Sequence, residues 1–66
     1  MLAQNIKKLR KKHKLSQEQL AKKAGITYST LIKIESGAND NPTIKTLIKI
    51  ATTLNVSIDS LISKKI

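Results

Sequence analysis

Cysteine is absent from the sequence, and His13 is its single histidine. Without cysteine no disulfide and no thiolate metal site can form, and one imidazole cannot build a multi-histidine site. The acidic residues Glu18, Asp40 and Asp59 form no evident acid–base pair with His13. We therefore expect a protein that holds no metal or cofactor and is not an enzyme.

Long apolar segments are also missing. No run approaches the ~20 apolar residues that a helix needs to cross a bilayer. The N-terminal region contains no apolar signal core, and a cytoplasmic protein is therefore the expectation. With 66 residues the chain is long enough for one domain, which we expect to span residues 1–66.

Glycine and proline are scarce, with two copies and one copy, and no segment alternates apolar and polar residues as a strand would. Apolar residues recur instead at helical spacing, which predicts an all-α protein. Five helices are expected, over residues 2–13, 17–24, 28–36, 44–54 and 58–62. Their predicted N-caps are Ser16 (with Gln19 as its capping-box partner), Thr27, Thr43 and Ser57, and three helices are expected to end at Gly25, Gly37 and Asn55.

Helical spacing also predicts the side chains of the core. The expected core residues are Leu2, Ile6, Leu9, Leu20, Ala21, Ala24, Leu31, Ile34, Ile44, Leu47, Ile48, Ala51, Leu54 and Leu61. Arg10 lies only about 70° from the centre of the first helix's apolar stripe, nearer than the neighbouring lysines. It is therefore the basic residue best placed to turn inward.

Acidic residues are few. The chain contains four Asp and Glu and 13 Lys and Arg, which gives a formal net charge of +9. That balance favours a polyanionic partner, with nucleic acid first and an anionic membrane second. A membrane surface is disfavoured because the chain has no Trp or Phe to anchor it. A charge that serves only solubility is the remaining alternative.

Two of the predicted helices, over residues 17–24 and 28–36, are joined by a short turn that contains Gly25. Two short helices joined in this way form the helix-turn-helix unit, which is predicted here over about residues 17–36. The pattern alone also fits a three-helix corner with no role in DNA binding.

The residue types narrow this choice. Residues 16–26 resemble the second helix and turn of the phage-repressor/Cro-like (XRE-type) helix-turn-helix family, and residues 27–37, which end Ile-Glu-Ser-Gly, resemble its recognition helix. Residues 41–57 resemble its fourth and fifth helices. The resemblance implies a compact five-helix lambda-repressor-like DNA-binding domain, which regulates transcription by binding double-stranded DNA sequence-specifically.

The helix over residues 28–36 directs a polar face away from its apolar side. In the family, the first, second and sixth residues of this helix commonly touch bases, and Tyr28, Ser29 and Lys33 stand at those positions. Ile32 is expected as an exposed aliphatic side chain that can meet a thymine methyl group. These four residues are the predicted base readers.

A second set is expected to contact the DNA backbone. By resemblance, the helix that starts at Ser16 and Gln17 abuts a phosphate, where free N–H groups favour an anion. The full predicted set is Lys14, Ser16, Gln17, Lys22, Thr27, Thr30 and Ser36. The loop over residues 38–41 departs from many relatives because it has no Lys or Arg and carries Asp40.

The resemblance also implies a structural role for Arg10. In the family, the positions of Arg10 and Glu35 often form a partly buried ion pair, and we expect that structural pair here. A contact between Arg10 and a phosphate stays open as the alternative.

The expected partner is a roughly palindromic DNA operator bound by a homodimer, which can assemble on the DNA. An apolar surplus at Ile58, Leu61, Ile62 and Ile66 predicts self-association through the last helix and the tail. The alternative is that Ile62 and Ile66 only cover the bottom of the core. An antitoxin-like or other protein-interaction module with the same fold is the alternative function.

Overall fold

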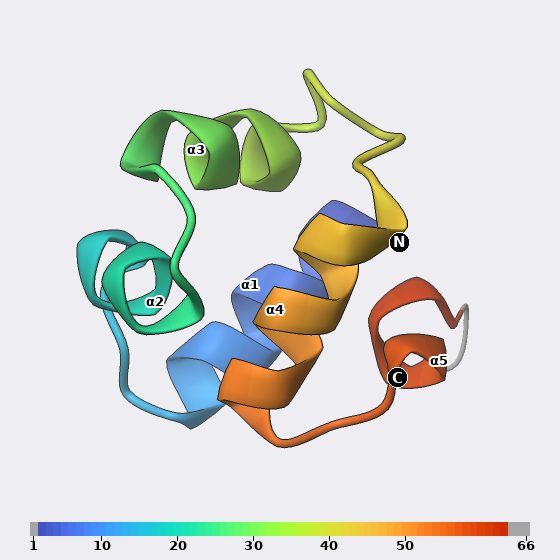
Figure 1. The fold of residues 1–66 in the computed structure, drawn as a ribbon. Helices are drawn as coiled ribbons and strands as arrows, with labels where there is room; N and C mark the ends of the chain where they lie inside the picture. The colour runs from blue at the N-terminus through green and yellow to red at the C-terminus, as the bar shows by residue number, and fades with distance from the viewer. Residues whose placement is uncertain (1, 64–66) are drawn as a thin grey trace.

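The computed structural model describes residues 2–63, which form five helices and contain no strand. The helices are α1 (Leu2–Lys12), α2 (Gln17–Ala24), α3 (Tyr28–Ser36), α4 (Ile44–Leu54) and α5 (Ile58–Ile62). α1 and α4 occupy the middle, with α2 and α3 on one side and α5 on the other (Figure 1). The predicted all-α, five-helix fold class is confirmed.

The helix boundaries follow from local hydrogen bonds. Ser16 Oγ accepts from the Gln19 backbone N–H, and Gln19 Oε1 accepts from the Ser16 backbone N–H, which completes a capping box at the start of α2. At the start of α3, α4 and α5 the side chains of the N-caps Thr27, Thr43 and Ser57 likewise accept a backbone N–H of the first turn. Left-handed residues end α2, α3 and α4, at Gly25, Gly37 and Asn55.

One boundary differs from the prediction. α1 ends at Lys12 rather than at His13, which belongs to the following turn. Lys14 takes the left-handed conformation, with φ 58°, and its N–H donates to the Lys11 carbonyl while the Leu15 N–H donates to the Arg10 carbonyl. These two bonds close the helix end as a glycine would, but a lysine at this position gives no such signal in the sequence.

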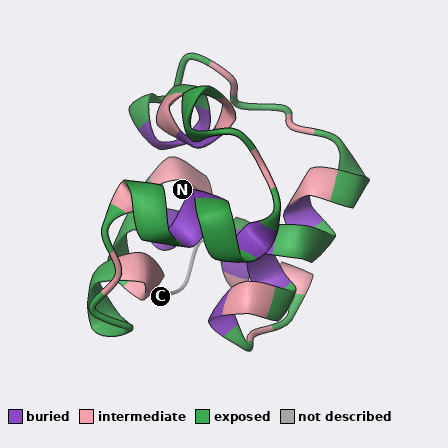
Figure 2. Ribbon diagram, turned by 60° about the vertical axis from the view of Figure 1, so that its left-hand side comes forward, coloured by how far each residue is buried: buried purple, intermediate pink, exposed green. Residues whose placement is uncertain are grey.

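The core lies where α1, α2, α3, α4 and α5 meet (Figure 2). Its buried apolar residues are Ile6, Leu20, Ala21, Ala24, Leu31, Ile34, Leu47, Ile50, Ala51, Leu54 and Leu61. Leu2 and Leu9, also predicted for the core, pack against it partly buried.

The prediction for α4 is wrong at two positions. Ile44 and Ile48 are 62% and 49% exposed, whereas Ile50, which was not predicted, is fully buried. The helix contains two overlapping patterns of core spacing, one running from residue 44 to 51 and the other from 47 to 54. α4 packs with the second pattern inward, and Ile44 and Ile48 therefore remain on the surface.

Asn5 joins the two ends of the described chain. Its side chain is buried in α1, and Nδ2 donates to the carbonyl oxygens of Leu61, at 2.8 Å, and Ser63, at 2.7 Å. These bonds satisfy carbonyl groups that the last turn of α5 leaves without helical partners. Among residues 2–63, no helix has the length and apolar character needed to cross a membrane.

Candidate nucleic-acid interface

The orientation of α3 is fixed by its inner face. Leu31, Ile34 and Glu35 are buried, while α2 and α1 both pack against the helix. α2 and α3 are joined through the turn at Gly25, and they form the corner at the upper left of Figure 1. The buried side of α3 therefore determines which of its residues face solvent.

The outer face carries most of the predicted base readers. Tyr28 is 49% exposed, and Ser29 and Lys33 are also exposed. Ile32, expected to be exposed, is only partly so, because it lies between the outer face and the packed side of the helix. An exposed aromatic ring, hydroxyl and ammonium group on one short helix suit the edges of bases in a major groove.

A buried ion pair ties α1 to α3. Arg10 Nε donates to Glu35 Oε2 at 2.8 Å, and Arg10 Nη2 donates to Glu35 Oε1 at 3.1 Å. Arg10 Nη1 donates to the Leu15 carbonyl, and the two side chains are only 11% and 1% exposed. Each of the three guanidinium nitrogens has an acceptor within residues 2–63, which favours the structural role expected for Arg10 over a contact with phosphate.

Gln17 completes this network, a role that no local sequence pattern predicts. Its Nε2 donates to Glu35 Oε1 at 3.0 Å, and the first residue of α2 is thereby joined to the last turn of α3. Gln17 was predicted to lie at a phosphate, and this contact of its side chain with Glu35 was not predicted. Its backbone N–H is not used in this network and stays available to a ligand.

The start of α2 presents hydrogen-bond donors to solvent. The N–H groups of Gln19 and Leu20 bond to Ser16, while those of Gln17 and Glu18 have no acceptor among residues 2–63. Free N–H groups and the positive end of the helix dipole attract an anion at such a position. The Ser16 hydroxyl oxygen accepts from Gln19, and its hydrogen is therefore free to donate to the same anion.

The hydroxyl groups around α3 differ in what they can still bind. Thr27 Oγ1 accepts from the Thr30 N–H and donates to Thr30 Oγ1 at 2.7 Å, which leaves the Thr30 hydroxyl hydrogen free. Ser36 Oγ donates to the Lys33 carbonyl and accepts from the Ala38 N–H. Thr30 is therefore a ready donor, whereas the hydroxyl groups of Thr27 and Ser36 are already occupied.

The basic residues predicted to contact the DNA backbone are accessible. Lys14, in the turn before α2, and Lys22, in α2, are exposed, and neither forms an ion pair with an acid of residues 2–63. No group of three His, Cys, Asp or Glu side chains in this part of the chain is arranged to hold a metal ion.

Comparison with known proteins places this geometry in context. The family model described as helix-turn-helix matches residues 6–61. SinR, an HTH-type transcriptional regulator of Bacillus subtilis, is 40% identical over 65 residues, which cover 98% of this chain and 59% of SinR. The chain therefore spans about three fifths of the length of this relative.

Solved structures of helix-turn-helix proteins are also similar to this chain. The crystal structure of SinR in complex with DNA superposes with a TM-score of 0.92 at 40% identity, over 96% of this chain and 100% of that one. The restriction-modification controller protein C.AhdI from Aeromonas hydrophila superposes with a TM-score of 0.85 at 32% identity, over 91% of this chain and 89% of that one. The match to the family model covers most of the chain, and this protein belongs to the helix-turn-helix family.

Proposed function

We propose that this chain is the DNA-binding domain of a transcriptional regulator that binds double-stranded DNA sequence-specifically in the cytoplasm. The observation that carries the proposal is the face of α3, where Tyr28, Ser29 and Lys33 are exposed while Leu31 and Ile34 anchor the helix in the core. The relative SinR, with which the chain shares its fold, is known in complex with DNA. The domain acts by occupying its site and performs no chemistry.

The outer face of α3 reads the major groove. Lys33 donates to the O6 or N7 acceptors of guanine, and Ser29 can donate to or accept from several base edges. Tyr28 and the exposed part of Ile32 contact the methyl group of thymine. Each of these contacts distinguishes one base pair from another because the major groove presents a different pattern for each pair.

Backbone contacts hold α3 in register. A phosphate lies at the start of α2, where it accepts from the free N–H groups of Gln17 and Glu18 and from the Ser16 hydroxyl. Thr30 supplies a hydroxyl donor from α3, and Lys14 and Lys22 supply charge. Thr27 and Ser36 support these contacts by fixing the ends of α3 rather than by donating to phosphate themselves.

Two copies bind together on a roughly palindromic operator. One recognition helix covers too few base pairs to select a single site in a genome, and pairing doubles the site. Ile62 at the end of α5 is half exposed, as are Ile44 and Ile48 on α4, against which α5 packs. We name these three residues the isoleucine surface and place the dimer contact there. Ile66, which was expected to contribute, lies outside the described residues.

The isoleucine surface also supports the second candidate, a protein-interaction module that captures a different protein. Exposed isoleucines suit any apolar partner, and they do not by themselves select a second copy. The two functions differ in what α3 does, because a protein-interaction module does not need its exposed hydroxyl and ammonium groups.

Binding-site selection from a pool of random duplexes tests the proposed function. A specific domain should enrich one consensus sequence with two related half-sites, spaced by about one helical turn of 10 base pairs. Recovery of duplexes without any consensus, at an affinity equal to that for random DNA, would exclude sequence-specific binding and leave the protein-interaction module.

A further inference from the structure

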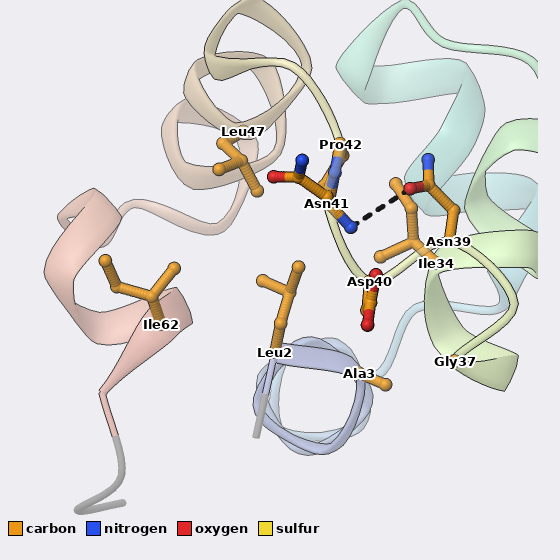
Figure 3. Close-up of a pocket in the computed structure, with 10 residues that line it drawn as sticks. All are labelled: Leu2, Ala3, Ile34, Gly37, Asn39, Asp40, Asn41, Pro42, Leu47 and Ile62. Atoms are coloured by element: carbon orange, nitrogen blue, oxygen red, sulfur yellow. Dashed lines mark hydrogen bonds between the residues drawn. The ribbon is translucent and has the colours of Figure 1, made fainter.

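A cavity of about 580 Å³ opens on the side of the domain where α1, α4, α5 and the loop after α3 meet (Figure 3). Leu2, Leu47 and Ile62, each from a different helix, converge on it, and Ile34 and Pro42 extend its apolar lining. Its volume lies within the range of about 300–1,000 Å³ that is usual for small-molecule sites. The cavity is therefore large enough for an apolar molecule of modest size.

The rim of the cavity is polar and is formed by the loop after α3. Asn39, Asp40 and Asn41 line it together. The Asn39 N–H donates to the Lys33 carbonyl at 2.9 Å, and the Asn41 N–H donates to Asn39 Oδ1 at 3.0 Å, a bond drawn in Figure 3. These two bonds fix the backbone on both sides of Asp40, which lines the rim.

Asp40 is not paired with a Lys or Arg of the described residues. The chain carries 13 Lys and Arg, yet none of those in residues 2–63 forms an ion pair with Asp40, whose side chain is exposed. An apolar lining with one unpaired carboxylate at its edge is complementary to a molecule with an apolar body and one positive end. The carboxylate would repel a fatty acid of the same shape.

We propose that this cavity binds a small amphiphilic amine, whose apolar body lies among Leu2, Leu47 and Ile62 and whose ammonium group pairs with Asp40. This site is separate from the outer face of α3, but it shares Ile62 with the isoleucine surface, and the monomeric free protein is therefore the form expected to bind the ligand. The long-range field works against it, because a chain of net charge +9 attracts anions and repels cations. A preference for the amine can therefore arise only from a local carboxylate.

Paired probes of equal length test the proposal. The full chain, labelled with ¹⁵N, is titrated at pH 7 and 0.15 M salt with n-octylamine and, separately, with n-octanoate. Salt at this concentration limits electrostatic effects to about 8 Å. n-Octylamine should shift the amide signals of Ala3, Gly37 and Asp40 and bind about fivefold more tightly than n-octanoate, near the upper end of what an exposed ion pair contributes.

Two variants locate the preference. Asp40→Asn should no longer prefer the amine, whereas Glu18→Gln, which removes the same charge from an exposed position outside the cavity, should keep that preference. The proposal is overturned if n-octanoate binds as well as n-octylamine, if Asp40→Asn retains the preference, or if the shifted amides lie elsewhere. It is also overturned if the free protein is already dimeric and binds neither probe, because a second copy would then occupy the cavity.

Discussion

Gln17 at the start of α2 donates a hydrogen bond to Glu35 in the last turn of α3, with 3.0 Å between Nε2 and Oε1. The same carboxylate accepts two hydrogen bonds from Arg10 of α1. One buried acid thus connects three helices. This contact holds in one relative orientation the helix that seats the proposed phosphate and the helix proposed to read the bases.

Gln17→Leu keeps the approximate volume of the side chain and removes the donor. We expect a loss of about 1–2 kcal/mol in the free energy of unfolding, since hydrogen bonds to charged groups contribute about 1.5–3 kcal/mol and Glu35 keeps its bonds to Arg10. Urea denaturation of Gln17→Leu, Glu35→Gln and the double variant measures this coupling. Strictly additive effects would show that the two residues do not act together.

Arg10→Ala should destabilise the domain far more than Lys11→Ala. Removing Arg10 leaves the Glu35 carboxylate buried with Gln17 as its remaining side-chain donor, at a cost of about 3–5 kcal/mol. Lys11 is exposed and lies beside Arg10 in sequence, which makes it the matched control. The two variants are compared by urea and thermal unfolding, and equal transition midpoints would contradict the structural role of the pair.

Local signals in the sequence were sufficient for most of the fold. Ser16, Thr27, Thr43 and Ser57 predict helix starts because their side chains accept from the first turn, and glycine predicts a left-handed end. The end of α1 was missed because Lys14 adopts that conformation without being a glycine. The end of α1 depends on contacts of its neighbours, since Leu15 packs against the core and Arg10 pairs with Glu35, and not on the conformational preference of lysine.

Tertiary contacts were harder to foresee. α4 carries two overlapping apolar patterns, and only the neighbouring helices determine that Ile50 is buried while Ile44 and Ile48 are exposed. Asn5 and Gln17 meet partners 56 and 18 residues away, and no spacing rule links them. The outer face of α3 was predictable, except for the partly buried Ile32, because a single helix and its apolar side determine it.

Lys33→Ala and Ser29→Ala should change which DNA sequence is selected and leave the stability of the domain almost unaltered. Each side chain is exposed on α3, and each lost base contact should reduce discrimination at one position by about 1–3 kcal/mol. Lys14→Ala should instead weaken binding to all sequences alike, as expected of a phosphate contact. Site selection with each variant checks this, and an unchanged consensus for Lys33→Ala would show that Lys33 reads no base.

Binding to duplex DNA should weaken steeply as salt rises. The net charge of +9 brings lysines to the DNA backbone, and each neutralised phosphate adds about 0.9 to the slope of log K against log salt. A dimer with a few such contacts per copy should show a slope of several units. Titration between about 50 and 200 mM salt measures it, and a flat response would contradict the electrostatic part of the interface.

The last prediction concerns the isoleucine surface. Ile48→Asp and Ile62→Asp each place a charge on a side chain that is about half exposed in the monomer, and both variants should therefore fold. In a dimer joined through α4 and α5 the same carboxylates are desolvated without a partner, which disfavours association. Sedimentation with a palindromic operator should show two copies of the wild type and only one copy of either variant at the same concentration.

Lys49→Asp is the matched control for charge, because it changes the net charge by more than either isoleucine variant but lies off the flank of α4 that carries Ile44 and Ile48. It should remain dimeric on the operator. A small apolar contact of this kind gives weak association, and the free wild type can be largely monomeric while DNA supplies the remaining free energy of pairing. Dimeric occupancy by folded Ile48→Asp and Ile62→Asp would place the contact between copies on a different surface.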